Sequence, residues 1–334
     1  MNNHQAFAIV ILNWNGQQLL EQFLPKLVQY SISVQIYVAD NASTDSSVSW
    51  VRQNFPMVNI IQNSQNLGFA GGYNEALKGV NEPYWVLINS DVEVSEGWLN
   101  RPQYLFDNRP EIGLIQPKIK SFKNPHLFEY AGAGGGLIDA FGYPYCQGRI
   151  LQDIEADQGQ YEHERAIFWA SGACLFVRKS VYETLHGFDA RFFAHQEEID
   201  LCWRAFRAAI TCWYAPDSVV YHVGGATLSE SNPHKTYLNF RNSLWMLTKN
   251  LPTAWLFPIL FSRLCLDGLA GLQYLFQQKP SHTWAIIRAH GGFYGQLHTL
   301  LRERKGPFPK NYYHTFSVVA GYYLRGKRRF GQLK

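Results

Sequence analysis

The sequence is short of charge and has no cysteine pattern that would organise a metal site or a disulfide framework. Asp, Glu, Lys and Arg make up 17% of the 334 residues, below the quarter that is usual for soluble domains. The five cysteines are odd in number, and no C-x-x-C motif occurs among them. A zinc site or a set of disulfides is therefore not expected, and we interpret the cysteines as reduced thiols in a cytosolic protein.

Several features that would define other classes of protein are also missing. The apolar run at residues 6–12 is short and lacks a basic start, so we expect a first strand there and no signal peptide. No stretch of ~18 uncharged apolar residues occurs, which argues against a clean transmembrane helix. No G-x-G-x-x-G motif follows the first strand and no Walker loop is present. A dinucleotide oxidoreductase is therefore a distant alternative.

Aromatic residues, by contrast, are abundant. Phe, Trp and Tyr make up 15% of the chain, with ten Trp, in a composition that is 46% hydrophobic. This apolar content suffices for one large domain or two. The net charge is +4, and the basic surplus lies near the carboxyl end, at Arg325, Lys327, Arg328, Arg329 and Lys334. A basic tail beside apolar segments indicates a membrane surface rather than nucleic acid as a partner.

Short apolar runs alternate with helical patterns from the amino end to about residue 112. We expect helices at 17–30, 43–55 and 68–80, and strands at 7–12, 34–40, 58–66 and 84–91. Continuous apolar strands separated by helices predict a parallel sheet that is covered on both faces and binds ligands at its carboxyl edge. Since each strand is followed by a polar cluster, we expect these clusters to converge on that edge.

The alternation breaks at about residue 112. Strands and a helix are expected over 113–119 and 166–185, the Gly-rich segment 131–149 is expected to be a loop, and 210–225 is expected to hold two short strands. These patterns predict a mixed sheet with loops over its ligand edge. Beyond residue 250 the chain is apolar and aromatic, but Arg263, Asp267 and Arg288 interrupt any full membrane span.

The segment VLINSDVEV, residues 86–94, ends a buried strand in polar residues. A turn explains Asn89, Ser90 and Asp91, because such side chains bond their own backbone. A metal site explains them as well, because a carboxylate at a strand end can hold a hard cation against a phosphate. Both interpretations stay open on the residues alone.

Acidic residues also gather before the helix that follows residue 196. Compensation of the helix dipole explains Asp200, and helix capping explains Asp45 in the same way. Glu197 and Glu198 fit that explanation less well, because the aromatic residues before them suggest the edge of a pocket. Burial of such a pair raises the pKa of one member, which is useful for a general base.

Two further features are weaker. The turn at Gly68, Gly71 and Gly72 permits close approach to a ligand, and the helix after it offers free N–H groups, although an ordinary strand-to-helix turn explains it too. His222 follows a strand and precedes Gly224 and Gly225, a tight turn that suggests a nearby ligand. A lone histidine is nevertheless more often structural.

Taken together, these segments resemble the inverting family 2 glycosyltransferases of the GT-A fold, and among them the rhamnosyltransferase-like enzymes of cell-surface polysaccharide synthesis. The matching stretches occur in family order over residues 7–227: VILNWNG, VADNASTDSS, NLGFAGGYNEAL, VLINSDVEV, ASGACLFVRKSVYETLHGFDARFFAHQEEIDLCWRA and VVYHVGGAT. TYLNFRNSLWMLTKN extends the match to about residue 250. The chain beyond that point is not covered.

The resemblance implies an α/β GT-A fold with a Rossmann-like mixed sheet and a C-terminal helical extension. INSD corresponds to the family's D-x-D-like motif, so Asp91 would bind Mg²⁺ or Mn²⁺, with Asn89 in place of the first acid. His222 would be the second metal ligand, and an imidazole suits Mn²⁺ better than Mg²⁺. Glu197 and Glu198 match the family's acid pair, in which the second position is the expected base. Glu198 is therefore the expected catalytic base and Glu197 the alternative.

The same resemblance implies a nucleotide site along the carboxyl edge. The residues expected to contact the nucleotide or to line its cleft are Asn13, Asn15, Asp40, Asn41, Asn66, Gly68, Asn74 and Asn89. Arg241 and Asn242 match an Arg-Asn pair of the family and are expected to reach the diphosphate or the acceptor. The chemistry is coherent in itself, since attack by a hydroxyl needs a base and the departing diphosphate needs positive charge.

The resulting hypothesis is a metal-dependent inverting glycosyltransferase. Its donor would be a UDP- or dTDP-linked sugar, and its acceptor a glycan or a polyprenyl-diphosphate-linked glycan at the cytoplasmic face of the inner membrane. Residues 1–250 would form the catalytic domain, with nucleotide-sugar and acceptor halves meeting near residue 112, and 251–334 a region attached peripherally to the membrane. The alternatives are a catalytically degraded binding protein for the whole chain, and a packed helical subdomain or dimer interface for the last region.

Overall fold

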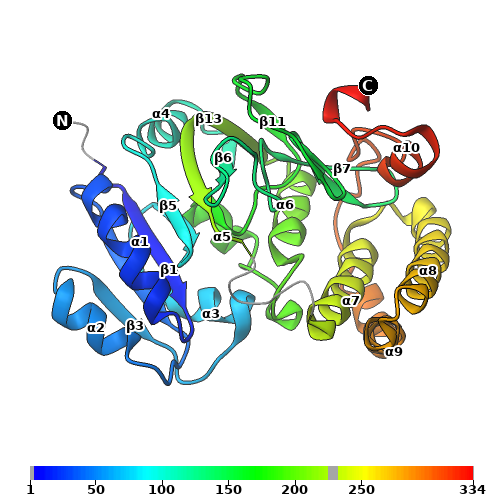
Figure 1. Ribbon diagram of the computed structural model, residues 1–334, viewed down its shortest axis with the longest axis horizontal. Helices are drawn as coiled ribbons and strands as arrows, with labels where there is room; N and C mark the ends of the chain where they lie inside the picture. Colours follow the sequence, from blue (N-terminus) through cyan, green and yellow to red (C-terminus); the bar gives the residue numbers. More distant parts are fainter. Residues whose placement is uncertain (1–3, 225–231, 334) are drawn as a thin grey trace.

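The structure, a computed structural model, describes residues 4–224 and 232–333. Gly225, part of the turn expected after His222, and Lys334 of the basic tail lie outside the described residues. At the centre of the molecule is a nine-stranded mixed sheet in the order β11-β13-β6-β12-β4-β1-β2-β3, with β5 paired to β13 (Figure 1). The strands are β1 Phe7–Asn13, β2 Gln35–Asp40, β3 Asn59–Gln62, β4 Tyr84–Asn89, β5 Val92–Val94, β6 Ile112–Ser121, β11 Arg165–Ile167, β12 Cys174–Arg178 and β13 Thr211–His222.

The sheet is parallel through β3, β2, β1 and β4, as the alternating pattern at the start of the chain predicts. β12 then runs antiparallel between β4 and β6, while β6 and β13 are parallel to each other. The carboxyl ends of β1, β2, β4, β6 and β13 therefore lie at one edge. The mixed sheet is confirmed, and ligand binding at this edge stays a prediction.

Alternate residues of each strand pack on opposite faces of the sheet, since successive side chains of a strand point to opposite sides. Phe7, Ile9 and Ile11 of β1 belong to a core shared with α1, α2 and α4, whereas Ala8 and Val10 face a second core with α3, α5, α6 and α7. The result is a three-layer α/β/α arrangement. The helices are α1 Gln17–Tyr30, α2 Ser47–Asn54, α3 Gly68–Ala76, α4 Asn100–Asn108, α5 Lys179–Thr184, α6 Glu197–Arg207, α7 Pro233–Asn250, α8 Thr253–Phe276, α9 Pro280–Glu303 and α10 Val318–Arg325, with short 3₁₀ turns at Leu77–Gly79, Ala190–Phe192 and Phe330–Gln332.

Two local predictions are wrong. The Gly-rich segment 131–149 is not a loop: it supplies most of a second, four-stranded sheet, made of β7 Gly136–Ile138, β8 Pro144–Cys146, β9 Arg149–Ile150 and β10 Asp153–Ile154. Its glycines allow close packing, since a Cβ on Gly136 would overlap the indole of Trp169. Residues 211–222 form one strand rather than two, because the pairing with β6 continues across an irregularity at Pro216, which lacks the N–H that regular pairing needs.

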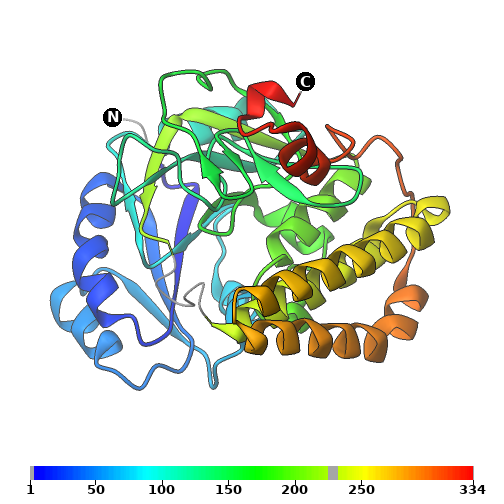
Figure 2. The ribbon, with the colours of Figure 1, turned by 45° about the vertical axis from the view of Figure 1, so that its right-hand side comes forward.

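The region after residue 250 is helical, as predicted. α8 and α9 run side by side as a hairpin against α7 (Figure 2). Apolar residues of this region, such as Leu260, Phe293 and Leu300, belong to the same core as α6 and α7. The segment after α9 returns to the second sheet, where Tyr312 and α10 pack. By length and composition α8 is also a candidate membrane span.

Candidate active site

Asp91 and His222 are brought together by strand pairing. Asp91 follows β4 and directly precedes β5, whose Val92 is the antiparallel partner of His222 at the end of β13. The N–H of Val223 also donates to the carbonyl of Asp91, at 3.1 Å. As a result, His222 Nε2 lies 3.1 Å from Asp91 Oδ1, although the two residues are far apart in the chain. Both side chains are buried.

Glu129 completes this cluster and was missed by the sequence analysis. Its Oε1 lies 3.3 Å from His222 Nδ1, on the opposite side of the ring from Asp91. Burial alone would lower the pKa of His222, but the two carboxylates outweigh burial and raise this pKa to about 10. Glu129 is a single acid with an aromatic residue on either side, just before the Gly-rich segment, so no motif marks it.

The donor set of Asp91 and His222 fits a divalent metal. A buried carboxylate oxygen and an imidazole nitrogen face each other, and Glu129 behind the imidazole is the kind of carboxylate that orients a metal-bound histidine. A metal ion would take the place of the proton that His222 Nε2 carries. Within the described residues no group of three or more His, Cys, Asp or Glu is arranged to hold an ion by itself. Asn89 is the last residue of β4, half-buried and two positions before Asp91.

The polar residues at the ends of β1 and β2 bond mainly to one another. Asn13 Nδ2 donates to Asp40 Oδ1 at 3.2 Å and to Ser47 Oγ at 2.9 Å. Asp40 Oδ2 accepts from the N–H of Ser43. Asn13 and Asp40 are both buried, while Oδ1 of Asn13 has no hydrogen-bond partner in the described part of the chain. That oxygen is the one unsatisfied acceptor of this cluster.

Asn15 joins two loops rather than projecting outward. It adopts a left-handed backbone conformation, with φ of 51°, and its Oδ1 accepts from the N–H of Thr44 at 2.7 Å. Asp45 accepts from the N–H groups of Gln17 and Ser47. It therefore contacts the first turns of both α1 and α2. The capping interpretation of Asp45 is confirmed.

Asn41 is a buried hub. Its amide nitrogen donates to Asn66 Oδ1 at 2.9 Å and to the carbonyl of Gly68 at 3.0 Å. Its amide oxygen accepts from Asn63 Nδ2 and from the N–H of Leu67. These contacts hold the turn before α3.

The amino end of α3 is not free to bind a phosphate. The N–H groups of Phe69 and Ala70 both donate to the carbonyl of Phe193, at 2.6 and 3.2 Å. Gly68 has a φ of +69°, and a Cβ at this position would lie 2.5 Å from the same carbonyl oxygen. The expectation of free N–H groups is wrong because the loop before α6 already occupies them. Gly68 is required here by close approach to Phe193.

Asn74 ties α3 to the same part of the chain. Its Nδ2 donates to the carbonyl of Phe188 at 2.8 Å, and its Oδ1 accepts from the N–H of Phe188 and from the hydroxyl of Tyr182. Both ends of the amide are engaged. A role of Asn74 in the nucleotide cleft stays a prediction.

The acid pair begins α6, with Glu197 buried and Glu198 half-buried. Burial, together with the neighbouring Glu198, raises the pKa of Glu197 well above its ordinary range. Burial also raises the pKa of Glu198 to about 7, and the N–H of Gly172 is among the groups that favour its ionised form. One carboxyl oxygen of each, Oε2, has no hydrogen-bond partner within residues 4–224 and 232–333. The raised pKa favours the neutral form of Glu197, while Glu198 is poised between its two states near pH 7.

The loop before the acid pair is strained. Phe193, His195 and Gln196 have φ values of 67°, 71° and 74°, although none is glycine, and such conformations cost of order 1 kcal/mol or more each. Burial, with the charges of Lys235 and His234, lowers the pKa of His195 to about 4. His195 is therefore neutral at physiological pH.

Asn242 holds this strained loop. Its amide nitrogen donates to the carbonyls of Phe192, Ala194 and His195, at 3.0, 2.9 and 2.8 Å. Arg241 donates to the carbonyl of Phe192 at 3.1 Å and lies over the ring of Trp245. The Arg-Asn pair thus contacts the backbone before the acid pair. Contact of Arg241 with a diphosphate stays a prediction.

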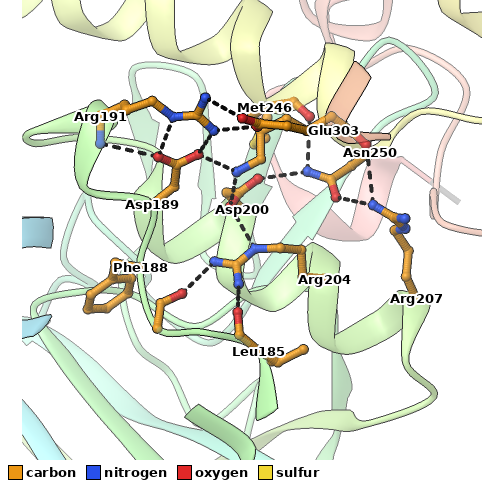
Figure 3. Close-up of polar contacts among 12 residues, drawn as sticks. Leu185, Phe188, Asp189, Arg191, Asp200, Arg204, Arg207, Met246, Asn250 and Glu303 are labelled. Carbon is orange, nitrogen blue, oxygen red and sulfur yellow. Dashed lines mark hydrogen bonds and ion pairs between the residues drawn. The ribbon is translucent and has the colours of Figure 1, made fainter. Parts of the chain in front are cut away.

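Asp200 does more than compensate a helix dipole. It is fully buried and accepts from Arg204 and Lys249 at 2.8 Å each and from Asn250 Nδ2, also at 2.8 Å (Figure 3). Burial opposes its ionisation, but Lys249 and Arg204 lower its pKa. Lys249 also pairs with Asp189. This network fastens α7 to α6 on the far side of the acid pair.

Comparison with known proteins identifies the family of the chain. A family model described as glycosyltransferase-like family 2 matches residues 4–239. The N-acetylglucosaminyl-diphospho-decaprenol L-rhamnosyltransferase of Mycobacterium tuberculosis is 27% identical over 236 residues, which are 65% of this chain and 76% of that protein. The low-salt glycan biosynthesis hexosyltransferase Agl10 of Haloferax volcanii is 23% identical over 308 residues, 90% of this chain and 92% of that one.

Solved structures share the fold. The mannosyltransferase PcManGT of Pyrobaculum calidifontis, in complex with GDP-Man and Mn²⁺, superposes with a TM-score of 0.53 at 14% identity, over 86% of this chain and 87% of that one. S. aureus TarS residues 1–349, in complex with UDP-GlcNAc, gives 0.55 at 13% identity, over 93% and 99%. The fold is that of the GT-A glycosyltransferases. The chain belongs to glycosyltransferase family 2, with rhamnosyltransferases among its relatives, and both the family and the enzyme class predicted from the sequence are confirmed.

Proposed function

We propose that the protein transfers a hexosyl or deoxyhexosyl group from a nucleoside-diphosphate sugar to a lipid-linked glycan, with inversion and with a divalent metal. The main supporting observation is that the acid pair and the Asp91–His222 pair share one edge. The carboxylate of Glu198 lies by the N–H of Gly172, and the next residue, Ala173, accepts a hydrogen bond from the N–H of Asn89. Asn89 is two residues from Asp91, so the proposed base and the proposed metal ligands are linked through the carboxyl end of β4.

Glu198 is the base in this proposal. An acceptor hydroxyl attacks the anomeric carbon, its proton passes to the Glu198 carboxylate, and the bond from that carbon to the diphosphate oxygen breaks with its electron pair. A pKa of about 7 suits this task, because proton transfer is most efficient when the pKa of the base lies near the working pH. Burial and the neighbouring Glu198 raise the pKa of Glu197, which favours its neutral form, so Glu197 would keep a second negative charge out of the site.

Asp91 and His222 would hold Mg²⁺ or Mn²⁺ against the diphosphate. The metal would neutralise the charge that develops on the leaving group. Glu129 orients the imidazole from behind. The donor would be UDP- or dTDP-linked and bound along β1 and β2.

The acceptor is proposed from chemistry shared with relatives. The mycobacterial relative acts, by its name, on a diphospho-decaprenol-linked sugar, and this chain carries an apolar helical region that the catalytic steps do not need. Attachment to the cytoplasmic face of the inner membrane, without crossing it, would bring the site to a carrier of that kind. Synthesis of a cell-surface polysaccharide is the process that such a transfer serves.

The test is a screen of nucleoside-diphosphate sugars for release of the nucleoside diphosphate, with Mn²⁺, with Mg²⁺ and with excess EDTA. We expect turnover of at least one donor, with inverted product, and loss of turnover in EDTA. Binding of a nucleoside diphosphate without turnover of any donor or transfer to any acceptor would favour the alternative, a catalytically degraded binding protein. Turnover that is unchanged in EDTA would exclude the metal.

A further inference from the structure

The charges that interrupt α8 in the sequence point into the protein. Arg263 is 4% exposed and donates to the carbonyls of Phe141 and Gly142, at 3.1 and 3.2 Å, and to Ser243 Oγ at 2.6 Å. Asp267 is 2% exposed and lies 3.3 Å from His290 of α9. These two are the charged residues of α8, so the outward face of this fully described helix carries no charge.

That outward face is apolar along its whole length. Phe257 is 79% exposed, Phe261 60% and Leu269 61%. The face continues to the end of the helix, where Leu272 and Phe276 are 51% and 87% exposed, and α9 adds Trp284 at 60%. At 1.5 Å per residue the helix of 24 residues is about 36 Å long. Exposed apolar patches larger than a few hundred Å² mark interaction sites.

The exposed charge around this face is positive. Between residues 253 and 333 the only acids are Asp267 and Glu303. Asp267 faces His290, and Glu303 pairs with Arg191 at 2.7 Å. Exposed cations along the hairpin, in contrast, include Lys279, Arg288 and Arg302. An apolar stripe with a basic border complements an anionic lipid surface.

The hairpin tip lies close to the candidate active site. Thr236 at the start of α7 is 2.7 Å from the ring of His282 at the start of α9. The same end of α7 lies beside the strained loop, whose His195 is influenced by Lys235. The tip is thus separated from the acid-pair loop by the first turns of one helix.

The hairpin is also fastened to the catalytic part. Arg191 bridges Asp189 of the loop before α6 and Glu303 at the end of α9, and Lys249 connects Asp189 to Asp200 of α6 (Figure 3). A surface that binds the hairpin would therefore fix the orientation of α6 as well. A loosely tethered anchor would not do this.

We propose that the outer face of the α8–α9 hairpin rests in the plane of an anionic lipid bilayer and presents the active site to it. This docking face consists of Phe257, Phe261, Leu269, Leu272, Phe276 and Trp284. The presentation of the site to a lipid-linked acceptor rests on the proposed function, but the docking itself does not. A transmembrane placement of α8 would take Arg263 and Asp267 from their protein partners, which the in-plane placement avoids.

The test is flotation of the full chain with vesicles of phosphatidylcholine alone and with added phosphatidylglycerol. The docking variant is Leu272→Gln/Phe276→Gln/Trp284→Gln. Its matched control is Ile32→Gln/Met57→Gln/Tyr104→Gln, which removes three exposed apolar side chains from the other end of the molecule. We expect wild type and control to float with anionic vesicles. The docking variant should bind at least about tenfold more weakly, because three apolar side chains that would be buried in the lipid are lost.

A second variant, Lys279→Glu/Arg302→Glu, changes exposed charge only and keeps the proposal testable if the first variant unfolds in a thermal melt. We expect it to lose binding to anionic vesicles. Absence of wild-type flotation, or equal flotation of wild type and both variants, overturns the proposal. So does a wild-type dimer in light scattering that the docking variant converts to a monomer, or attachment that resists both high salt and alkaline carbonate, which indicates a span.

Transfer to a water-soluble acceptor separates this proposal from the proposed function. Flotation without donor turnover would leave the docking face standing and remove the glycosyl transfer. Turnover with a soluble acceptor that is equal in wild type and docking variant, combined with loss of flotation in the variant, is the expected result. It would show that the face binds lipid and is not part of the catalytic machinery.

Discussion

At the carboxyl ends of β1, β2 and β3, polar side chains bond mainly to other parts of the protein. Asn41 bonds at both ends of its amide, and so does Asn74 in the following α3. Within the described residues, Oδ1 of Asn13 and Oδ1 of Asn63 are exceptions. At the ends of β4 and β13 and the start of α6, the groups are acids and a histidine: His222 lies between two carboxylates, and Glu197 and Glu198 each have a carboxyl oxygen without a hydrogen bond in the described structure.

The difference indicates a division of labour along one sheet edge. Amides whose hydrogen bonds are all made fix the shape of loops. Buried ionisable groups that lack some of their hydrogen bonds cost stability, and they persist where they perform chemistry. Substitutions at the ends of β4 and β13 and at the start of α6 should therefore lower turnover, whereas substitutions of the hydrogen-bonded amides should lower stability and leave turnover nearly unchanged.

Asp91→Ala should reduce transfer by roughly four orders of magnitude or more, because a catalytic metal supplies several kcal/mol of charge stabilisation. His222→Ala should do less damage, since one ligand of several is lost. The measurement is kcat with the best donor over a range of Mn²⁺ concentrations. Asp45→Ala is the matched control: another carboxylate of the edge, which caps helices and should cost about 1 kcal/mol of stability with turnover retained. Equal activity of Asp91→Ala and Asp45→Ala would refute the metal role.

Glu198→Gln should lower kcat by roughly two to four orders of magnitude, as expected when a general base is removed while its shape is kept. Nucleotide affinity, measured by calorimetry, should be unchanged. Glu197→Gln should have a much smaller effect, because the raised pKa of Glu197 already favours its neutral form. A dead Glu197→Gln beside an active Glu198→Gln would reverse the two assignments.

The pH dependence follows from the same carboxyl group. Because burial raises the pKa of Glu198 to about 7, the base is ionised only above that pH, and kcat/KM should fall about tenfold per unit as the pH drops below it. Stability changes in the opposite direction. A carboxyl whose pKa is raised in the folded state stabilises most below its unfolded pKa, and that contribution is lost as the pH rises through 7. Glu198→Gln should therefore melt higher than wild type at pH 8, and the two should converge near pH 4.

Asn242→Ala should lower kcat by roughly ten- to a hundredfold while leaving the KM of the donor nearly unchanged. Its amide holds three carbonyls of a strained loop, so its loss lets the acid pair move, and a displacement of this kind costs rate rather than ground-state binding. Asn239→Ala is the matched control, one turn earlier on α7, where the amide donates to the carbonyl of Lys235. A shift of the kinetic pKa in Asn242→Ala alone would distinguish positioning from general destabilisation.

The sequence predicted the sheet edge better than it predicted the contacts at that edge. Apolar runs and polar strand ends determine where the chain turns, and this pattern predicted that the residues around Asp91 lie at the carboxyl edge, where β4 ends. His222 and the acid pair were assigned to the site by the family resemblance. Glu129 escaped because its partner His222 is distant in the chain and no local pattern marks it. The Gly-rich segment 131–149 was misread as a loop because close packing against Trp169, not turn geometry, requires Gly136.

The roles of individual side chains were the least predictable part. A polar residue at the end of a strand can bond to its own loop or to a ligand, and the local sequence is the same in both cases. Gly68 shows this clearly: a free helix end and one closed by the carbonyl of Phe193 have the same local sequence. Burial and partner geometry decide between the two, and both depend on residues from a distant part of the chain. Motif resemblance locates such a residue without assigning its task.

Asn74→Ala gives the smallest expected effect on turnover and is the sharpest test of the saturated region. The substitution leaves the N–H and carbonyl of Phe188 and the hydroxyl of Tyr182 without their partner, and unpaired buried groups cost about 1–3 kcal/mol. Chemical denaturation should show that loss, while kcat and donor KM at 25 °C stay within about twofold, because α3 is still held by the carbonyl of Phe193. A donor KM raised tenfold without loss of stability would instead put Asn74 in the nucleotide cleft, as the family resemblance implies. The boundary between the amides that shape loops and the residues that act on the substrate would then lie at β3 rather than at β4. The nucleotide would in that case reach further along the edge than the hydrogen bonds of the Asn74 amide indicate.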